Sequence, residues 1–436
     1  MSLDCVAVEQ GDAECEQGLS ALCLDRQDNV QEYEHCKQFI LLLGEALHCY
    51  GASSQSLEDA LVQLAKTLSI HVEVLSTPTS MIVAFERGGG AQDVMLLRVE
   101  PGGVDLSRLC QLNEVAGEVT RGDVSLEQGV EKIDDILGAQ PEWGAVHLVL
   151  ASVLSSLCVA RFLSATWYEV LCCAVLGGVV GGLGLWMPRS VVTARLYEPV
   201  AALLVGFVSA LLAAFFSMEV SILLVSALIV LVPGFTLTIA IKELATRNLV
   251  SGASRSFGAF LIFLELGFGV FVGQKLAAAL GEVWSGHLGV LERVVISSSW
   301  TELIALVLAP VALSVLFQAR KQDLFAMCVS GVIAYVGSKF GRQMLGAEVG
   351  AFLGALGVGC CGNLLARMGD RPATALQIPG VIMLVPGSVG FVSVTALLEQ
   401  DVTRGVQVGF GMMMIAISIV AGLLVADALI SSRKVF

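Results

Sequence analysis

The stretch Leu231-Val-Pro-Gly-Phe-Thr-Leu-Thr-Ile-Ala240 interrupts a long apolar run with a Pro-Gly pair. A second interruption, Leu384-Val-Pro-Gly-Ser-Val-Gly390, follows at an offset of 153 residues. Proline removes a hydrogen-bond donor from a helix, and inside a bilayer the freed carbonyl must find protein, water or ligand. Interrupted helices at corresponding places of two repeats are typical of the substrate site of a carrier. The pattern therefore predicts a transporter.

The two copies stay in register beyond the Pro-Gly pairs. Each pair is followed by glycines eighteen and twenty-four residues after its own glycine: Gly252 and Gly258 after Gly234, and Gly405 and Gly411 after Gly387. Each copy holds five predicted spans, which is an odd number, so the second copy enters the membrane in the opposite sense. We expect the two breaks to face each other across a pseudo-two-fold axis in the membrane plane.

The composition is that of a membrane protein with a soluble part. Of the 436 residues, 56% are hydrophobic and 15% are charged, and the mean hydropathy is +0.80. Residues 1–142 hold 25 Asp/Glu against 8 Lys/Arg, whereas residues 143–436 hold 14 against 17. An acidic soluble part thus precedes a weakly basic membrane part, and nothing indicates binding of nucleic acid.

The chain divides into five segments. Residues 1–28 are predicted to be a disordered acidic tail, 29–142 a small α+β cytosolic domain, 143–280 the first repeat, 281–299 a linker, and 300–436 the second repeat. Within the domain, Ile70–Ser76, Thr79–Glu86 and Gln92–Glu100 have the composition of strands. The first thirty residues lack an apolar run and predict no cleaved signal peptide. The fold class is an α-helical polytopic membrane protein of about ten transmembrane helices, arranged as two inverted five-helix repeats after this domain.

Ten apolar segments approach the length of about seventeen to twenty-five residues that a membrane-spanning helix needs. They are 143–163, 170–187, 198–216, 220–241, 257–280, 300–318, 323–340, 346–365, 374–395 and 403–430. With the N-terminus inside, the inner loops carry eleven Lys/Arg and the outer loops six. This bias favours a cell-membrane protein with both termini in the cytosol.

The ends of the broken helices are the first candidates for a transport site. Half-helix ends offer N–H groups to anionic ligand atoms and carbonyl groups to cationic ones. Hydroxyl groups within two turns of a break could line the same cavity, or could instead bond to the carbonyl four residues earlier. The residues chosen on this ground are Pro233, Gly234, Thr236, Thr238, Pro386, Gly387 and Ser388.

Two polar residues inside apolar spans are further candidates. Gln377 lies two residues before Pro379-Gly380, where we expect a non-helical stretch that lines water. Glu265 sits in the middle of an apolar span, where an ionisable group is costly and indicates function, such as proton coupling. The alternative for Glu265 is a structural role as the buried partner of an arginine or a hydroxyl group.

Charged residues near the span ends give weaker signals. Glu243 and Arg255 flank the segment after the first break, and they either pair, gate the inner mouth or lie in solvent. Glu302 and Asp427 are expected to reach interfacial water. Asn363 is expected to bridge helices rather than to contact a ligand.

No catalytic or cofactor motif is present. The twelve cysteines include no CxxC, and the chain has neither GxSxG nor HExxH, so we expect no enzyme activity, metal site or cofactor. A hydrolase built from soluble-domain residues is the alternative of another class, with Ser53, Ser54, Asp59 and His71 as its imaginable parts. An uncoupled channel or scaffold is a third possibility.

At these motifs the chain resembles the threonine/serine exporter family, whose two-subunit relatives include a succinate exporter. The motifs are Tyr50-Gly-Ala52 with Glu58, Ser76-Thr-Pro-Thr79, Arg121-Gly-Asp123, the series Pro233-Gly234, Glu243, Gly252 and Arg255, and the second pair Pro386-Gly387. Here both membrane modules are fused in one chain. The sequence departs from the family pattern at Ile239, where relatives often have Asn, and at Ser56, where they often have a basic residue.

The resemblance implies export of a small polar metabolite, a threonine/serine-type amino acid, by antiport driven by the proton motive force. Export of a succinate-type dicarboxylate is the runner-up. The expected partners are the small-molecule substrate, protons and the lipid bilayer, and the sequence leaves homo-oligomerisation open.

Overall fold

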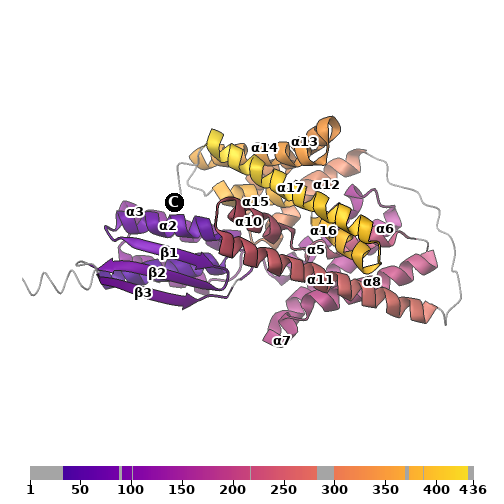
Figure 1. Cartoon of the computed structure of the whole chain (residues 1–436), viewed down its shortest axis with the longest axis horizontal. Coiled ribbons are helices and arrows are strands. Elements are labelled where there is room, and N and C mark those ends of the chain that lie inside the picture. The colour runs from indigo at the N-terminus through magenta and orange to yellow at the C-terminus, as the bar shows by residue number, and fades with distance from the viewer. Residues whose placement is uncertain are drawn as a thin grey trace, which may run out of the picture.

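A computed structural model describes residues 33–87, 91–100, 102–216, 218–281, 299–368, 373–385 and 387–430. The predicted tail 1–28, most of the predicted linker 281–299 and Pro386 lie outside these residues. The described chain forms a small N-terminal domain beside a larger bundle of helices (Figure 1). Helices dominate, as the sequence predicts, and the sheet is confined to the N-terminal domain.

The N-terminal domain packs helices against one face of a three-stranded antiparallel sheet. The strands are β1 (Val72–Thr77), β2 (Ser80–Arg87) and β3 (Ala91–Arg98), in the order β1-β2-β3. A helix over residues 33–49 precedes them, followed by α2 (Ser54–Thr67), while α3 (Leu106–Arg121) and α4 (Leu126–Gly138) come after. All three predicted strands are therefore present, within a few residues of their predicted ends.

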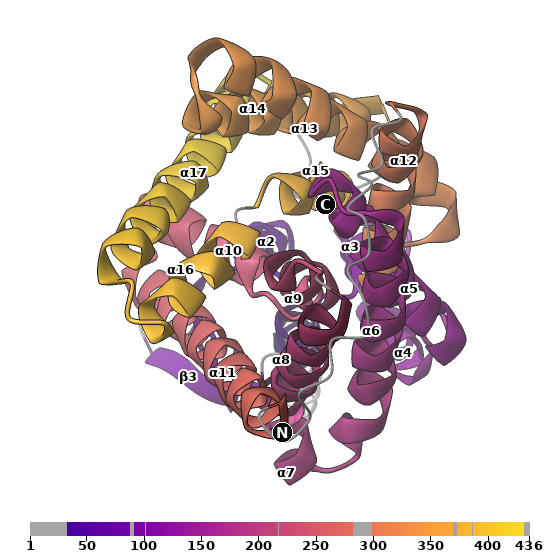
Figure 2. The same ribbon diagram turned by 90° about the vertical axis from the view of Figure 1, so that its right-hand side faces the viewer.

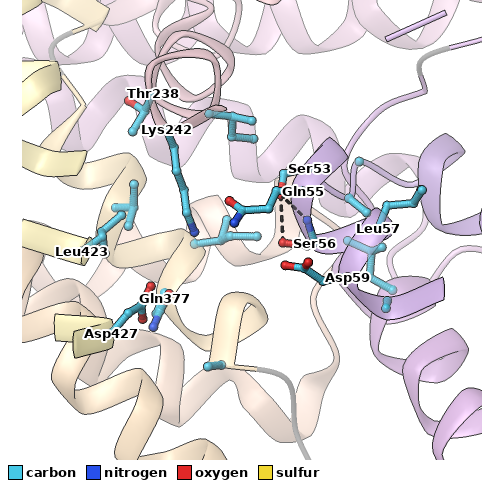
Figure 3. A pocket seen from close by; sticks show the side chains of 18 of the residues that line it. Ser53, Gln55, Ser56, Leu57, Asp59, Thr238, Lys242, Gln377, Leu423 and Asp427 are labelled. Carbon is cyan, nitrogen blue, oxygen red and sulfur yellow. Dashed lines mark hydrogen bonds between the residues drawn. The ribbon is translucent and has the colours of Figure 1, made fainter. Parts of the chain in front are cut away.

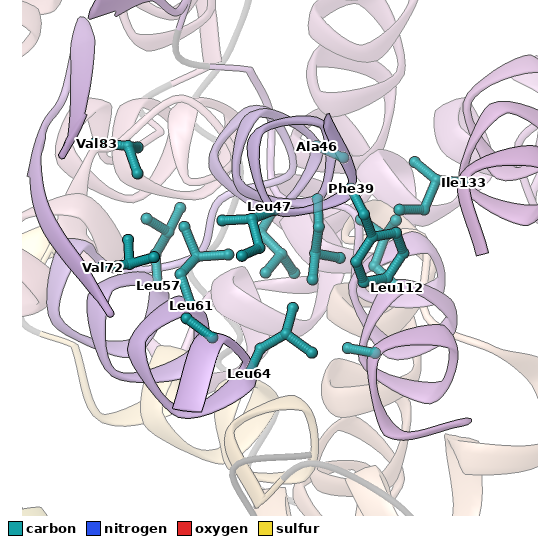
Figure 4. Close-up of a cluster of buried hydrophobic side chains, with 14 of the residues drawn as sticks. Phe39, Ala46, Leu47, Leu57, Leu61, Leu64, Val72, Val83, Leu112 and Ile133 are labelled. Atoms are coloured by element: carbon teal, nitrogen blue, oxygen red, sulfur yellow. The ribbon is translucent and has the colours of Figure 1, made fainter. Parts of the chain in front are cut away.

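The core of this domain follows the periods of its strands and helices. On β2, Met81, Val83 and Phe85 alternate with more exposed residues and are fully buried, as the period of two in a strand requires. They meet Leu61 of α2 and Phe39 of the first helix in one cluster of buried apolar side chains (Figure 4). The domain thus has its own hydrophobic core, apart from the membrane helices.

The bundle consists of a first and a second half. The first half contains α5 (Ala145–Phe162), α6 (Trp167–Trp186), η1 (Met187–Arg189), α7 (Val191–Ala194), α8 (Tyr197–Phe216), α9 (Val220–Leu228), α10 (Gly234–Ala245) and α11 (Leu249–Gly281). The second half contains α12 (Ser299–Leu316), η2 (Lys321–Asp323), α13 (Leu324–Leu345), α14 (Ala347–Met368), α15 (Ala373–Leu384), α16 (Gly387–Leu398) and α17 (Val402–Leu429).

Eight helical stretches in the described part of the chain are long and apolar enough to cross a membrane. Two of the ten predicted spans are not among them. The predicted span 220–241 is divided into α9 and α10 by the first break, and 300–318 corresponds to α12, which is apolar but short. The prediction of a polytopic helical membrane protein is confirmed.

The helices of the two halves pack in matching pairs. In the first half α5 packs on α6, α8 on α11, and α10 on α11; in the second half the equivalents are α12 on α13, α14 on α17, and α16 on α17. Contacts between the halves are reciprocal, because α11 packs on α16 and α17 packs on α10. Figure 2 shows the short helices α9, α10, α15 and α16 surrounded by the longer ones.

The match extends to single residues at the offset of 153. Between α10 and α11 the chain turns through Arg247, which has a φ of 69°, and between α16 and α17 it turns through Gln400, also with a φ of 69°. These left-handed residues allow the next amide to reach back, Asn248 N to the carbonyl of Glu243 over 2.8 Å and Asp401 N to that of Ala396 over 2.9 Å. The two turns are built in the same way.

The glycines that follow also have equivalent surroundings. A Cβ atom on Gly252 would lie 2.7 Å from Cγ of Leu244, and one on Gly405 would lie 2.5 Å from Cγ of Leu397, which is the equivalent residue. A Cβ on Gly258 or on Gly411 would meet no heavy atom within 4 Å. The first pair of glycines therefore serves close helix packing, whereas the second pair is not required for it.

Candidate functional site

The two breaks meet inside the bundle. α9 ends at Leu228 and α10 begins at Gly234; α15 ends at Leu384 and α16 begins at Gly387. A Cβ atom added to Gly234 would lie 2.2 Å from Cγ1 of Val385 and 3.1 Å from Cα of Gly387. Only a glycine, which has no side chain, permits this approach. The predicted meeting of the two breaks is thus seen.

The contact is reciprocal. A Cβ atom on Gly387 would lie 2.6 Å from Cγ1 of Val232, and Val232 stands 153 residues before Val385. Pro233 is buried and directly precedes α10. Pro386, its predicted counterpart, lies outside the described residues. The two glycines and the two valines therefore hold the breaks in close contact.

The hydroxyl groups near the breaks do not converge on one space. Thr238 is buried and donates its hydroxyl to the carbonyl of Gly234 over 3.1 Å, which is the bond to the residue four positions earlier. Its side of α10 nevertheless borders the cavity described next. Thr236 and Ser388 are half-buried, make no hydrogen bond among the described residues and do not border that cavity.

A cavity of about 360 Å³ lies between the N-terminal domain and the bundle (Figure 3). One wall comes from the start of α2 and from α3, and the facing walls come from α10, α14, α15 and α17. Its polar lining residues are Ser53, Gln55, Ser56, Asp59, Asn113, Thr238, Lys242, Thr246, Asn363, Gln377 and Asp427. Ser56 and Ile239, the two positions at which the chain departs from the resembled pattern, both line it.

Lys242 extends from α10 into this space. Figure 3 shows its side chain between Asp427 and Gln377 on one side and Ser56 and Asp59 on the other. No carboxylate in the described part of the chain lies within ion-pair distance of its ammonium group. The ammonium group of Lys242 therefore has no counter-ion among the residues whose positions the structure gives.

A chain of amide groups connects α15, α14 and α17 at the cavity wall. The side-chain amide of Gln377 donates to Oδ1 of Asn363 over 2.9 Å, and the amide of Asn363 donates to Oδ1 of Asp427 over 2.8 Å. Gln377 is 8% exposed and Asn363 is 1% exposed. Buried polar groups need such partners, and these bonds fix the Asp427 carboxylate at the cavity. Asn363 bridges helices, as predicted.

The expectation of a non-helical stretch at Gln377 is wrong. Gln377 lies within α15, which continues through Pro379 to Leu384. A proline is tolerated in a membrane helix where neighbouring helices satisfy the freed backbone groups. Gln377 borders the cavity through the face of a helix rather than from an unwound segment.

Glu243 joins the bundle to the N-terminal domain. It is 1% exposed, and its Oε1 accepts a hydrogen bond of 3.0 Å from the backbone N–H of Ser54, the first residue of α2. Nε of Arg255 lies 3.2 Å from its Oε2, so the two residues form an ion pair. Glu243 is therefore neither solvated nor aimed at the cavity. It binds the positive end of a helix dipole.

Serine hydroxyl groups extend this junction. The hydroxyl of Ser54 donates to Oγ of Ser251 on α11 over 2.9 Å, and Ser251 donates to the carbonyl of Ser76 on β1 over 2.7 Å. Next to them, the imidazole of His48 lies 3.0 Å from the carbonyl of Pro78 and 3.3 Å from Oγ of Ser76. Burial lowers the pKa of His48, and burial raises the pKa of Glu58, which accepts from the N–H of Ser76.

A second junction uses backbone groups. At the start of α3, the N–H of Leu106 donates to the carbonyl of Phe317 over 2.9 Å, and the N–H of Ser107 donates to that of Gln318 over 3.1 Å. The side chain of Gln318 also holds the backbone of Trp143, accepting from its N–H over 2.8 Å and donating to its carbonyl over 3.1 Å. The domain is thus fastened to α10 and α11 of the first half and to the two residues that follow α12 in the second.

Two other predicted acids lie away from the cavity. Glu265 is half-buried on α11, where Glu198 of α8 acts on it electrostatically, and it is not part of the cavity lining. Glu302 accepts from Nζ of Lys339 over 2.8 Å and from the hydroxyl of Tyr335, instead of having only interfacial water as a partner. A carboxylate with these donors is the anionic member of a local ion pair.

The imagined hydrolase residues do not assemble. Ser54 bonds to Ser251, Oγ of Ser53 lies 2.8 Å from that of Ser56, and His71 lies 3.3 Å from Glu86 at the exposed side of the sheet. No contact among the described residues joins His71 to any of the serines. A nucleophile needs a base within hydrogen-bond reach, and this set does not provide one.

Lys242 and Asp427 were not among the residues predicted for the site. Lys242 was counted only as a cation of an inner loop, although it directly follows the apolar segment of the first break. In the structure α10 continues to Ala245, so Lys242 remains on a helix that borders the cavity. The signal available in the sequence was the unbroken helical pattern from Gly234 past Lys242.

Comparison with known proteins agrees with the fold and the two halves. A family model described as "Putative threonine/serine exporter" matches residues 38–277, and one described as "Threonine/Serine exporter, ThrE" matches residues 302–429. The first match covers the N-terminal domain and the first half, and the second match covers the second half. No solved structure matches.

Curated relatives include several fungal proteins. Pheromone-regulated membrane protein 10 of Candida albicans is 27% identical over 81% of this chain and 32% of its own length. The protein of that name from Kluyveromyces lactis is 27% identical over 88% of this chain and 42% of its own length. An uncharacterized protein of Schizosaccharomyces pombe is 26% identical over 80% and 47%. This chain spans less than half the length of these relatives.

The paired breaks, the matching halves and the two consecutive matches, the first of which covers more than half of the chain, lead to one conclusion: the chain belongs to the threonine/serine exporter family.

Proposed function

We propose that the protein is a secondary active exporter of a small polar metabolite, a threonine/serine-type amino acid, that works by alternating access about the paired breaks. The observation that carries this proposal is the contact between the breaks at Gly234 and Gly387, where two interrupted helices pack closely because neither glycine has a side chain. Secondary transporters of several folds bind substrate where such discontinuous helices meet.

The matching halves support an inverted repeat. Equivalent helices make equivalent contacts, and the contacts between the halves are reciprocal, as a two-fold axis requires. The five crossings that the sequence predicts for each half, an odd number, would give the halves opposite orientations in the membrane. Rocking of one half against the other then gives the cargo access to each side in turn.

The N-terminal domain and the end of α17 lie at the same end of the bundle, because Asp427 and α2 line one cavity. Together with the excess of Lys/Arg in the loops on this side, this supports a cell-membrane protein with both ends of the chain in the cytosol. The cavity then lies at the cytosolic end of the bundle, where an exporter takes up its cargo.

Transport by the purified protein in proteoliposomes tests the proposal. A carrier exchanges labelled L-threonine for unlabelled L-threonine across the bilayer, whereas an open channel only equilibrates it. Gly234→Ala and Gly387→Ala place a Cβ 3.1 Å and 3.6 Å from the Cα of the facing glycine and within 2.6 Å of a valine side chain, so both should reduce exchange at least about tenfold.

Gly258→Ala and Gly411→Ala are the matched controls, because the added methyl groups meet no atom within 4 Å. They should exchange like the wild type. Wild-type vesicles that exchange neither amino acids nor dicarboxylates would refute the exporter assignment, and normal exchange by both Gly234→Ala and Gly387→Ala would remove the breaks from the mechanism.

Coupling to the proton motive force is part of the proposal and rests on the family resemblance. With threonine inside the vesicles, an imposed pH gradient should accelerate its release, and a protonophore should cancel the acceleration. If the pH gradient does not change the rate of threonine release, transport is not coupled to protons and the mechanism is simple exchange.

A further inference from the structure

We propose that the cavity between the N-terminal domain and the bundle is the cargo site, and that it holds an α-amino acid with the carboxylate at Lys242 and the ammonium group at Asp427. The inference rests on the proposed exporter function and adds the residues that hold the cargo. It also makes the N-terminal domain part of the binding site.

Lys242 supplies the positive side of the cavity. Its side chain is half-buried, and no carboxylate of the described residues pairs with it. A partly desolvated ammonium group favours an anionic ligand, because the attraction between charges grows as water is excluded. Glu243, the next residue, has other partners: its Oε1 accepts from the N–H of Ser54, and its Oε2 lies 3.2 Å from Nε of Arg255.

Asp427 supplies the negative side. Its Oδ1 accepts the hydrogen bond from Asn363, while its Oδ2 accepts none from the residues that the structure describes. The bonds from Gln377 to Asn363 and from Asn363 to Asp427 hold the carboxylate in one orientation. A carboxylate fixed by neighbours in this way is preorganised for a cationic ligand group.

The remaining lining suits a short, polar side chain. A cavity of about 360 Å³ is at the small end of the range for ligand pockets, about 300 to 1,000 Å³. Ser53, Gln55 and Ser56 at the start of α2 offer hydroxyl and amide groups, and Phe235 and Ile378 form apolar walls. A larger apolar cargo would remove water from these polar groups without offering hydrogen bonds in return, which is costly.

The two charges belong to different halves of the bundle. Lys242 is on α10 of the first half, Asp427 is on α17 of the second, and the serines are on α2 of the N-terminal domain. A ligand that bridges them contacts all three parts at once. Cargo bound here therefore stabilises one arrangement of the halves over the other, which is the differential affinity that conformational coupling needs.

The test measures exchange of two labelled probes, L-threonine and succinate, by the full chain in proteoliposomes. Lys242→Gln removes the carboxylate-binding charge and should raise the apparent KM for both probes at least about tenfold, while Lys242→Arg keeps most of the activity. Asp427→Asn should raise the KM for threonine by a similar factor and should leave succinate exchange unchanged or improved, because a repulsion is removed.

Lys275→Gln and Glu399→Gln are controls of the same charge changes at exposed positions outside the cavity, and they should exchange like the wild type. Wild-type vesicles that exchange neither probe would refute the exporter proposal itself. Exchange of threonine that is equal in the wild type, Lys242→Gln and Asp427→Asn would refute only the cargo site.

A purely structural role is distinguished by the second probe. Asp427→Asn could instead raise the KM for threonine and for succinate by the same factor. Asp427 would then support the bundle without binding an ammonium group, and the assignment would fail. Ser56→Ala addresses the N-terminal domain: a raised KM for threonine, with an unchanged maximal rate, supports its place in the site, and an unchanged KM excludes it.

Discussion

The segment from Gly234 to Arg255 and its equivalent, Gly387 to Val408, have the same backbone and different side chains. Both run from a break through a short helix, turn through a left-handed residue and return along a long helix. In the first segment Glu243 and Arg255 form a buried ion pair that holds the N-terminal domain. At the same offset of 153, the second segment has Ala396 and Val408.

This difference distinguishes the residues that both repeats require for packing from those that serve only to hold the N-terminal domain. Glycines at the break and at the helix contact are kept in both copies, because both copies cross and pack in the same way. The buried ion pair occurs only in the copy that carries the domain, because its two positions are Ala396 and Val408 in the other copy. A buried ion pair is costly to desolvate and is weak evidence for stability, so its presence on one side indicates a specific docking function.

Removing the carboxylate of Glu243 should have the largest effect on the docking of the N-terminal domain. In Glu243→Gln, Arg255 and the dipole of α2 lose their counter-charge, and loss of one partner of a buried pair costs about 3 to 5 kcal/mol. We expect the N-terminal domain to undock, with faster hydrogen exchange in α2 and easier proteolysis between the domain and α5. Glu348→Gln, an exposed acid, is the control. Unchanged protection of α2 would show that the ion pair does not fasten the domain.

Adding a methyl group at the equivalent glycines comes next. Gly252→Ala and Gly405→Ala each place a Cβ within 2.7 Å of a leucine Cγ, and overpacking of this kind costs about 1 to 3 kcal/mol. The melting temperature in detergent should fall by a similar amount for both. A loss confined to one glycine would show that the two segments are not energetically equivalent.

The second junction, between α3 and residues 317 and 318, should lose less stability on mutation than the junction at Glu243. Gln318→Ala removes two hydrogen bonds to the backbone of Trp143 but leaves the backbone bonds from α3 to Phe317 and Gln318 in place. We expect a loss of about 1 to 2 kcal/mol, because single hydrogen bonds contribute about 0.5 to 1.5 kcal/mol. Hydrogen exchange of α3 measures it. An effect as large as that of Glu243→Gln would reverse the ranking of the two junctions.

Acidification should have the smallest and most gradual effect on the stability of the N-terminal domain. The folded protein holds the pKa of His48 below the ordinary value of 6.5, chiefly through burial. Between that lowered pKa and 6.5 the unfolded state binds more protons, so the contribution of His48 to stability is present above pH 6.5 and is lost as the pH falls. The melting temperature of the domain should drop on acidification from pH 7.

A histidine variant isolates this contribution. His48→Asn should flatten the slope of melting temperature against pH, whereas His71→Asn, at an exposed position, should leave it unchanged. Glu58 acts in the opposite sense, since its raised pKa makes the folded state bind more protons above pH 4.5 and lowers stability as the pH rises. If the slope is the same in His48→Asn, the histidine does not carry the dependence.

Much of the fold could be predicted from the sequence, because its signals are local. Apolar length identified the membrane helices, and alternation with turn residues identified the strands. The break at Pro233-Gly234 was visible as a motif, whereas the helix through Gln377 was not, since its continuity depends on neighbours that satisfy the backbone around Pro379.

The candidate site was predictable only in part. The spacing of 153 residues indicated that Gly234 and Gly387 correspond, and they are in contact. The bond between Ser54 and Glu243 joins residues 189 apart and carries no periodic signal. The bonds from α3 to Phe317 and Gln318 are made to backbone carbonyl groups, which every residue has. No pattern of side chains in the sequence could therefore predict them.

The short helix α10 extends from the contact between the breaks to the N-terminal domain. Gly234 is its pivot, and Glu243, nine residues on, stands about 13 Å away at a rise of 1.5 Å per residue. A tilt of about 10° at the pivot would carry the carboxylate of Glu243 by about 2 Å, which is enough to break a hydrogen bond of ordinary length. In the alternating access proposed above, a tilt of α10 would therefore act on the N-terminal domain through the hydrogen bond from the N–H of Ser54 to Glu243.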